Sequence, residues 1–430
     1  GGDVSTDLGR ALRDAVADEP TFVVDPQALA HTGRHRLRRR NAIAVGTATL
    51  ATAAVLVATS LVSRPSTSDP DPAPAERTVR LDLDDAVAVR PEVVASTRTT
   101  WRDEGKNSLE FDRLEGITTD GLVLRSRYTN AHGTTELGLL DPSTGSTDWL
   151  PDPPWRSGDI AGVDLGADRL VVVVRTHVYQ YAISVLDRAT RAWRPHTVVR
   201  LPAGTEVHTT ARALVGPDDR LYLGSTMEGR SGPMHWWSAP VVGGGQMQPE
   251  PDLEGAAVAW GDDGTRVTAD PEGHVVLSGP RGERVVGERR PAGCERPSGF
   301  PDAPPHAVAA GDRAVVTFYC DSGDPDVAVP LTVVYARGSL TRIEGGTALA
   351  SDDRHLLVLG GDGSSHPTGS YVGETWIYLV DVDRSTVSRL GRGLHDRQVD
   401  VGAGMVLWNS PGRLDDKSVY DVTWSVAPLG

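Results

Sequence analysis

The sequence predicts an all-β fold, a β-propeller with seven blades favoured, preceded by one transmembrane α-helix. Two observations carry this prediction. A tight turn followed by a short apolar strand recurs seven times through most of the chain. One long uncharged segment precedes the repeats. The abundance of Gly (47) and Pro (30) among 430 residues agrees with many short strands joined by turns.

The repeat has the length of one four-stranded propeller blade. Its first turn residues are separated by 48, 51, 53, 40, 41 and 50 positions. Asp suits these turns because its carboxylate bonds the local backbone, and Gly suits them because it accepts a positive φ. The seven turns are Asp120-Gly121, Asp168-Arg169, Asp219-Arg220, Glu272-Gly273, Asp312-Arg313, Asp353-Arg354 and Ala403-Gly404.

A second turn, Asp-x-x-Thr, follows later in three of the repeats and predicts the hairpin between the third and fourth strands of a blade. It spans residues 141–144, 187–190 and 383–386. After the last repeat only one further strand remains, at 419–426, so the last blade lacks its fourth strand. The alternating segment 78–83 is a candidate to supply it, which would close the ring. Residues 86–110 are not placed, so six or eight blades stay open.

On these turns and strands, residues 78–430 resemble bacterial propeller domains of the WD40-like and TolB-like kind. The blades carry neither a Trp-Asp signature nor a kelch double glycine. Asp262-Asp263-Gly264-Thr265 is similar to the Asp-box turn of sialidase-type propellers, where that turn is structural. The layout of tail, Arg cluster and membrane helix resembles bacterial proteins with an outer sensor domain, some of which restrain a sigma factor. That resemblance implies a signalling role.

Residues 41–63 are predicted to cross a membrane. The segment has 23 residues without a charge and reaches roughly 34 Å as a helix, enough for a hydrocarbon core of about 30 Å. Five arginines lie at 34–40, just before it. Basic residues stay cytoplasmic, so residues 1–40 form a cytoplasmic tail with short helices and the rest lies outside. The Pro-rich residues 64–76 are a linker, and 77–430 are the extracytoplasmic propeller.

Two features of the N-terminal region leave alternatives open. Arg39-Arg40 before an apolar segment also fits a cleaved secretory signal, but the region ahead of it is longer than such signals have. The tail is either disordered and serves only to orient the membrane segment, or it forms a helix. In the second case the apolar stripe of residues 8–16 would dock on a cytoplasmic regulator.

Charge excludes one class of partner. The formal net charge is −15, and residues 76–430 carry all of it, because the tail and linker nearly cancel. A domain this acidic repels nucleic acid and anionic lipid. We therefore expect no nucleic-acid binding.

The chain has two cysteines, Cys294 and Cys320, and both lie in the predicted outer domain. In an oxidising compartment they are candidates for a disulfide, whereas the alternative is two buried thiols. A loop of about 27 residues closed in this way would add about 3–4 kcal/mol in the chain-entropy model.

The sequence contains no specific catalytic motif. It lacks the His spacing of zinc sites and the G-x-S-x-G nucleophile elbow, so catalytic residues stay unknown and no metal or cofactor is expected. Neighbouring acids, such as Asp352-Asp353, fit solvated turns better than a calcium loop. Trp236 and Trp237 are adjacent, so in a strand they face opposite ways, and one of them is a candidate exposed binding aromatic. The alternative is that both pack between blades.

Two classes of function follow. The favoured one is a membrane-anchored extracytoplasmic binding or sensing propeller, with an unknown outer ligand or protein and a cytoplasmic regulator bound through its tail. The alternative is a surface-tethered hydrolase or lyase with a site at the propeller mouth, since propeller loops bring together residues that are far apart in the chain.

Overall fold

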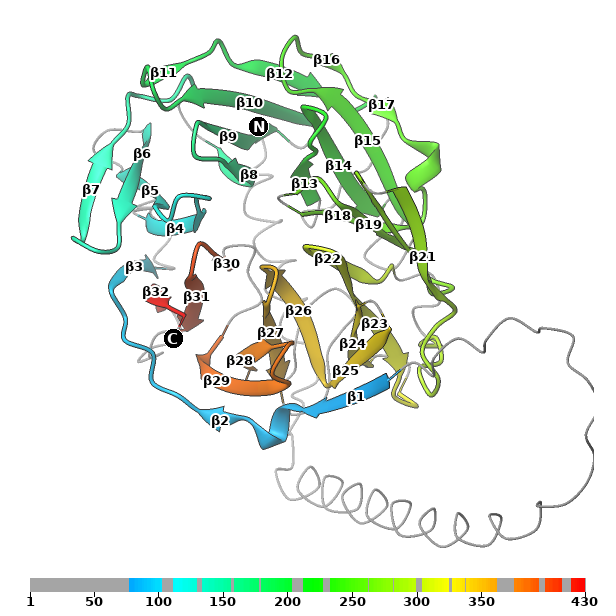
Figure 1. Cartoon of the computed structure of the whole chain (residues 1–430). Coiled ribbons are helices and arrows are strands. Elements are labelled where there is room, and N and C mark those ends of the chain that lie inside the picture. Colours follow the sequence, from blue (N-terminus) through cyan, green and yellow to red (C-terminus); the bar gives the residue numbers. More distant parts are fainter. Residues whose placement is uncertain are drawn as a thin grey trace, which may run out of the picture. The chain divides into compact units, whose positions relative to one another are not determined.

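A computed structural model describes residues 77–102, 111–129, 134–155, 158–177, 179–202, 212–226, 233–261, 263–280, 282–298, 304–324, 327–336, 338–361, 375–393, 399–411 and 419–429. They form seven β-sheets arranged in a ring (Figure 1). The prediction of an all-β, seven-bladed propeller is therefore confirmed. Within these ranges no helix is both long and apolar enough to span a bilayer, and the predicted membrane segment 41–63 lies outside them.

The first four blades each contain consecutive strands, which are named below from the ring centre outward. Blade 1 is β4 (Phe111–Ile117), β5 (Val123–Thr129), β6 (Thr134–Asp141) and β7 (Ser146–Trp149). Blade 2 is β8 (Asp159–Leu165), β9 (Arg169–His177), β10 (Gln180–Asp187) and β12 (Thr197–Arg200), with β11 (Ala192–Trp193) also paired to β10. Blade 3 is β13 (Arg212–Val215), β14 (Arg220–Thr226), β15 (Met234–Pro240) and β17 (Gln248–Pro249). Blade 4 is β18 (Ala257–Trp260), β19 (Arg266–Ala269), β20 (His274–Gly279) and β21 (Gly282–Glu288).

The last three blades each recruit a strand from the start of the described chain. Blade 5 is β22 (His306–Ala310), β23 (Arg313–Asp321), β24 (Ala328–Ala336) and β25 (Ser339–Glu344), extended by β1 (Arg77–Asp82). Blade 6 is β26 (Gly346–Ser351), β27 (His355–Gly361), β28 (Thr375–Asp381) and β29 (Thr386–Arg392), extended by β2 (Val87–Ala88). Blade 7 is β30 (Asp400–Gly402), β31 (Met405–Pro411), β32 (Val419–Pro428) and β3 (Ala95–Arg102). Two short 3-10 helices, η1 (Leu83–Asp85) and η2 (Pro251–Leu253), and β16 (Gly245–Gln246), which pairs with β12, complete the elements.

Ring closure occurs as the sequence predicts, but with a different strand. The last blade does lack its own fourth strand, and β3 supplies it in an eight-residue antiparallel pairing with β32. The segment predicted for this role, 78–83, instead forms most of β1 and pairs in parallel with β25 of blade 5. The alternation of apolar and polar residues in this segment indicates a strand with one buried face. Because such a strand can pair with the outer edge of any blade, the pattern does not identify which blade it joins.

Six of the seven predicted repeat turns join the first and second strands of their blades. The exception is Glu272-Gly273, which joins the second and third strands of blade 4. The equivalent turn there is Asp263-Gly264, the one similar to an Asp-box, where the Asp263 carboxylate accepts hydrogen bonds from the backbone and hydroxyl of Thr265. The turn at 383–386 does join β28 to β29, but Asp381 is the residue that caps it.

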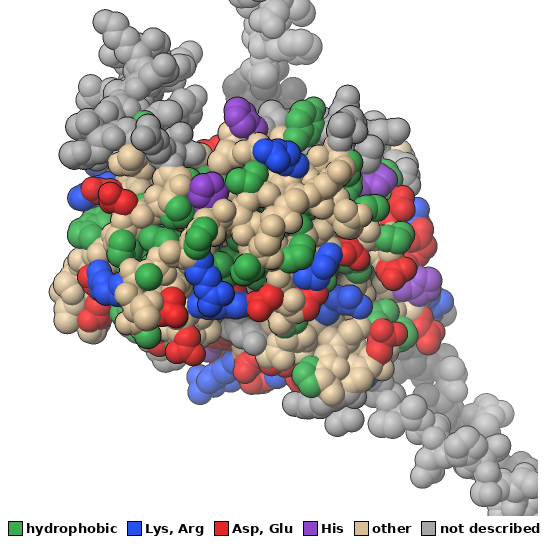
Figure 2. Space-filling view, turned by 90° about the horizontal axis from the view of Figure 1, so that it is seen from above, with side chains coloured by type: hydrophobic (Ala, Val, Ile, Leu, Met, Phe, Trp, Pro, Cys, Tyr) green, Lys and Arg blue, Asp and Glu red, His purple; other side chains and the backbone are tan. Residues whose placement is uncertain are grey.

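The blades are held together by apolar side chains that fill the space between neighbouring sheets. In β9, Leu170 to Val174 are all fully buried. Val171 and Val173 pack toward blade 3, while the alternate residues pack toward blade 1. Both faces of a blade are therefore core, which explains why its second strand is a continuous apolar segment. Outside this core, acidic and basic side chains are interspersed over the face that lies at the top of Figure 1 (Figure 2).

Side chains from one blade also satisfy irregular backbone in the next. The first strand of blade 1 has a bulge between Leu114 and Gly116. Next to it, the Ile117 amide donates a 2.8 Å hydrogen bond to the Asp400 carboxylate of blade 7. A Cβ at Gly116 would come within 3.3 Å of that carboxylate and 2.8 Å of Leu165. A side chain at 116 would therefore require Leu165 and Asp400 to shift.

We expect Asp400→Ala to lower the free energy of unfolding by about 1–3 kcal/mol, because it leaves the partly buried Ile117 amide without its acceptor at the ring closure. Urea unfolding followed by tryptophan fluorescence measures this. The matched control is Asp152→Ala, since Asp152 is exposed in the connection between blades 1 and 2. Equal stability of the two variants would contradict a role for Asp400 in closure.

Candidate functional site

A pocket of about 340 Å³ lies between blades 1 and 2, where the strand-joining turns of both blades meet. Four leucines line it, together with two arginines, two aspartates and one serine. They are Leu122, Leu139, Asp141, Ser146, Asp148, Leu150, Leu186, Arg188 and Arg191. The lining is thus mixed, and it offers an apolar contact area beside oriented charged groups.

The apolar walls come from strands whose side chains alternate between the two faces of a blade. Leu139 on β6 and Leu186 on β10 are buried and belong to the core between blades 1 and 2. Leu122 and Leu150 are half-buried and pack against the same core. The pocket is therefore a place where the inter-blade core reaches the surface.

Two arginines from blade 2 reach across to carboxylates of blade 1. The Arg188 guanidinium donates to both oxygens of Asp120 at 2.7 and 2.8 Å, and to the Gly166 carbonyl at 3.1 Å. The Arg191 guanidinium bonds both oxygens of Asp148, and it donates to the Trp149 carbonyl at 2.8 Å. Bidentate pairs of this kind fix orientation as well as charge.

The local turn explains how Arg191 reaches its partner. The residue four positions after the capping Asp has a positive φ in all three hairpins of this type, at Gly145, Arg191 and Ser385. Glycine is the usual residue there because L side chains are strained in this conformation. At Arg191 the strained residue is the one that pairs with Asp148 of the neighbouring blade.

The charged groups at the pocket are held in their ionised forms. Hydrogen bonds from the Arg188 guanidinium lower the pKa of Asp120 below its ordinary value, even though partial burial opposes this. Arg191 lowers the pKa of Asp148 in the same way, and Asp148 raises the pKa of Arg191. The Ser143 hydroxyl and amide lower the pKa of Asp141. Each of these groups is therefore charged at neutral pH.

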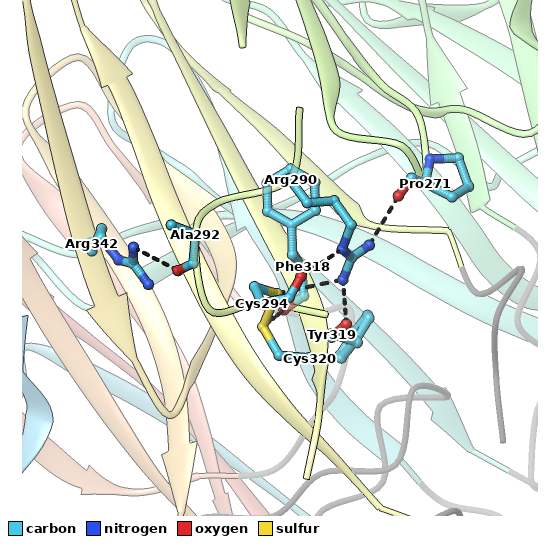
Figure 3. Close-up of a disulfide and its surroundings, with 8 residues drawn as sticks. All are labelled: Pro271, Arg290, Ala292, Cys294, Phe318, Tyr319, Cys320 and Arg342. Atoms are coloured by element: carbon cyan, nitrogen blue, oxygen red, sulfur yellow. Dashed lines mark hydrogen bonds between the residues drawn. A yellow bond between two sulfur atoms is a disulfide. The ribbon is translucent and has the colours of Figure 1, made fainter. Parts of the chain in front are cut away.

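A disulfide lies elsewhere in the ring and joins Cys294 to Cys320, as the cysteine count predicts (Figure 3). Cys294 belongs to the connection between blades 4 and 5, and Cys320 to β23 of blade 5. Both are buried. The bridge therefore ties the connection to the sheet that follows it.

Arg290 packs against this disulfide (Figure 3). Its guanidinium donates to the carbonyl oxygens of Pro271, Cys294 and Tyr319, and lies 5.3 Å from the centre of the Phe318 ring. Burial lowers the pKa of Arg290 to about 10, so it remains a cation at neutral pH. These contacts fix the segment that connects blades 4 and 5 around the disulfide. We therefore assign Arg290 a structural role.

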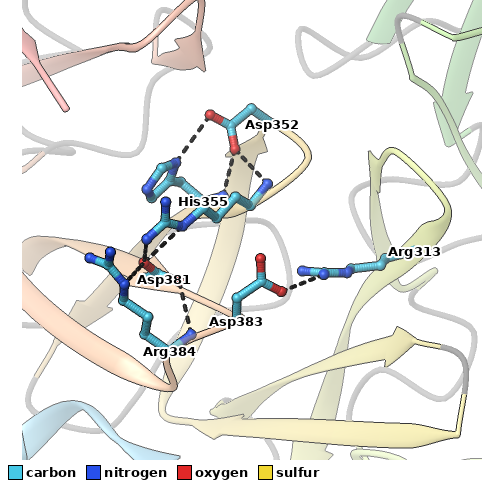
Figure 4. Close-up of polar contacts among 7 residues, drawn as sticks. Arg313, Asp352, His355, Asp381, Asp383 and Arg384 are labelled. Atoms are coloured by element: carbon cyan, nitrogen blue, oxygen red, sulfur yellow. Dashed lines mark hydrogen bonds and ion pairs between the residues drawn. The ribbon is translucent and has the colours of Figure 1, made fainter. Parts of the chain in front are cut away.

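A third polar cluster lies on the turns of blades 5 and 6 (Figure 4). Arg313 of blade 5 pairs with Asp383 of blade 6 at 2.5 Å, and Arg354 pairs with Asp381 at 2.5 Å. Burial favours a raised pKa at Asp381, but hydrogen bonds from Arg354 and the Arg384 amide overcome it and lower the pKa. The pair between Arg313 and Asp383 is an inter-blade Arg–Asp pair, as at the pocket.

The prediction that Trp236 or Trp237 is exposed is wrong, since their relative exposures are 2% and 6%. They do face opposite sides of β15, but both sides are covered. Trp236 packs between blades 3 and 4 and donates to the Ala256 carbonyl at 2.8 Å, whereas Trp237 packs between blades 2 and 3. The alternative that both pack between blades is the correct one.

The acidic pairs in the described part of the chain behave as turn residues. Asp82 caps η1, and Asp352 accepts from the amides of Arg354 and His355. Within the described ranges, no three metal-ligating side chains come together. Asp415-Asp416 lies outside those ranges.

Sequence reasoning missed the pocket, although it marked Asp120, Asp141 and Asp187 as turn residues. The ion pair between Arg188 and Asp120 joins residues 68 positions apart, so no local pattern reveals it. The one local feature that points to the pair is the arginine that directly follows the capping aspartate, at Asp187-Arg188.

No family model matches the chain, and no curated protein matches it. Solved structures do. An oligogalacturonate lyase in complex with manganese is 14% identical, with 79% of this chain and 98% of that chain covered and a TM-score of 0.44. The β-propeller domain of the Trilobed protease from Pyrococcus furiosus is 13% identical, with 63% and 86% covered and a TM-score of 0.35. An oligogalacturonate lyase from Vibrio parahaemolyticus is 11% identical, with 78% and 98% covered and a TM-score of 0.40. Similarity this distant carries no conclusion about activity, and the resemblance to WD40-like or TolB-like domains stays a prediction.

We expect Asp120→Asn to lower the free energy of unfolding at pH 7 by about 1 kcal/mol or less, because the pair with Arg188 is partly screened by solvent. The folded-state pKa of Asp120 lies below the ordinary 3.8. Its contribution is therefore complete above that value and is lost as the pH falls through the folded-state pKa. Thermal unfolding of both proteins between pH 3 and 8 checks this. A difference that grew on acidification would contradict the assignment.

We expect replacement of both Cys294 and Cys320 by Ala to lower the free energy of unfolding by about 3–4 kcal/mol, because the bridge closes a loop across a separation of 26 residues. Urea unfolding of the variant and of the oxidised protein measures the loss. Reduction of the wild-type protein should reproduce most of it. An unchanged midpoint after verified reduction would show that the bridge is dispensable.

Proposed function

We propose that this protein is a membrane-anchored, extracytoplasmic propeller that binds or senses a ligand at the pocket between blades 1 and 2. In this proposal residues 41–63 anchor it, and residues 1–40 face a cytoplasmic regulator. The observation that carries the proposal is the pocket itself. It combines apolar walls with two guanidiniums, Arg188 and Arg191, that are already held in inter-blade ion pairs.

Charged side chains that stay ionised favour ligand binding over a role in proton transfer. A general acid or base works best when its pKa lies near the operating pH. At this pocket the shifts run the other way, since the pKa values of Asp120, Asp141 and Asp148 are lowered and that of Arg191 is raised. Groups held in this manner present fixed charges in a fixed geometry, which lowers the entropic cost of binding.

The lining also indicates a ligand class. Arg188 is committed to Asp120 and Arg191 to Asp148, whereas hydrogen bonds from Ser143, a neutral residue, hold the Asp141 carboxylate. The pocket therefore presents leucine walls beside a carboxylate that is held by neutral donors. An aliphatic group next to a cationic one, as in a peptide or peptide-like ligand, complements this arrangement.

Two further observations support an outer location for the propeller. The disulfide between Cys294 and Cys320 is of the kind that persists in oxidising compartments. The arginine cluster at 34–40 precedes the uncharged segment 41–63, and this order favours a cytoplasmic tail.

We expect Ser146→Trp to abolish capture of the outer ligand, because Ser146 is exposed at the pocket and an indole there would fill it. The measurement is a cross-linked pull-down from native membranes with the full chain. Ser96→Trp is the matched control, since Ser96 is exposed on β3 of blade 7. If the Ser146 and Ser96 variants recover the same partners as the wild type, the pocket is not the binding site.

A second variant replaces residues 1–30 by a neutral flexible tail and keeps the arginine cluster. Loss of a cytoplasmic protein with this variant alone would support signalling through the tail. Recovery of the same cytoplasmic partners, or of none, would leave the tail as a topology signal. Turnover of a captured ligand by the wild type and not by Ser146→Trp would favour the surface-tethered hydrolase or lyase instead.

A further inference from the structure

The N-terminal part of the propeller exposes an unusual concentration of valines. Seven large hydrophobic side chains are exposed in the described chain, and four of them lie within residues 87–94. These four, which we name the valine rim, are Val87, Val89, Val93 and Val94, with exposed fractions of 67%, 36%, 48% and 38%. The other three are scattered over blades 2, 3 and 4. Single exposed apolar residues are ordinary, whereas four of them within eight residues of one segment are not.

The backbone holds the valine rim firmly in place. β2 pairs in parallel with β29, and the Val89 amide donates to the Arg389 carbonyl of blade 6 at 3.0 Å. At the other end, the Val94 amide donates to the Val426 carbonyl of blade 7 at 2.9 Å. The segment therefore runs along the outer edges of two blades (Figure 1), and its valines project from a fixed support.

The polar surroundings of the valine rim suit the interface between water and lipid. β29, the strand that supports β2, carries Arg389, whose guanidinium stacks on the Trp376 ring at 4.7 Å. Arg90 is exposed within the segment itself. Arginine and tryptophan beside aliphatic side chains are typical of protein surfaces at the level of lipid headgroups.

The chain ahead of the valine rim limits what can cover it. The described chain begins at Arg77, only 14 positions after the end of the predicted membrane segment at Ser63. A Pro-rich linker of that length spans at most about 40–45 Å. β1 and β2 are thus the first propeller elements that the chain reaches from the bilayer. On an anchored chain, the linker therefore lets the valine rim reach the surface of the membrane.

We propose that the valine rim, on the outer edges of blades 6 and 7, rests on the surface of the anchoring bilayer. This inference depends on the membrane anchor of the proposed function. The contact is apolar and does not rely on anionic lipid, because the exposed Asp84, Asp85 and Glu92 flank the valines and the outer domain as a whole is acidic. Zwitterionic lipid is therefore sufficient.

The test uses the full chain reconstituted into phosphatidylcholine vesicles. The native cysteines are paired, so Val93→Cys supplies one labelling site for an environment-sensitive fluorophore. Val285→Cys is the matched control, because Val285 is 56% exposed on blade 4, away from the segment 87–94. We expect a phosphatidylcholine that carries a spin label near its headgroup to quench the probe at 93 at least threefold more than the probe at 285. Aqueous iodide should quench the probe at 93 less.

The outcomes separate this inference from the anchor. Flotation of the vesicles is scored first, and a chain that does not float would overturn both the anchor and the valine rim contact. A floating chain whose two probes are quenched equally by lipid would overturn the contact alone. Protection from iodide that rises with protein density, without quenching by lipid, would assign the valine rim to a second copy of the chain and also overturn the proposal. Replacing phosphatidylcholine in part by anionic lipid should lower the quenching of the probe at 93, because the acidic outer domain is repelled by anionic lipid.

Discussion

Each blade is apolar on both faces, so every sheet of this protein depends on a neighbour on either side. The buried segment from Leu170 to Val174 in β9 contributes to two inter-blade cores at once. A row of such sheets would leave an apolar face exposed at each end, and closing the ring removes both ends. The strand that closes it, β3, comes from the start of the described chain and completes the last blade. Asp400 and Gly116 then allow the last and first blades to approach closely at the junction.

This dependence explains which parts of the fold could be predicted from the sequence. The turn between the first two strands is short and local, and Asp and Gly satisfy its conformation, so its period is visible in six of seven blades. Blade 4 is the exception because its first two strands have only four residues each, and the next turn, Glu272-Gly273, follows closely. The position of β1 could not be predicted, because a strand with one buried face suits any blade edge. The exposure of Trp236 or Trp237 was predicted wrongly. Alternation along a strand shows that the two side chains point to opposite faces of the sheet, but only the packing of the blades shows that both faces are buried.

The pocket could not be predicted from the sequence for a related reason. Its ion pairs join turns of neighbouring blades, and their partners lie 68 and 43 positions apart. Arg–Asp clamps alone do not mark a functional site, since Arg313 and Asp383 form one between blades 5 and 6. At the pocket, the ion pairs lie beside four leucine side chains in a cavity of about 340 Å³. The charge pairs orient the edge of the pocket, and the leucines supply the apolar area that a ligand would cover.

The path of the N-terminal segment links these two parts of the molecule. β1, β2 and β3 follow the outer edges of blades 5, 6 and 7 in turn, so the end of the chain that leads to the predicted anchor is attached to one side of the ring. The pocket lies between blades 1 and 2, which β1 and β2 do not extend. The same N-terminal segment also supplies the closing strand β3, so ring closure and the proposed membrane contact involve neighbouring parts of the chain. Any force on the linker would therefore be borne first by the pairing of β1 with β25, before it reached the strand that holds the ring shut.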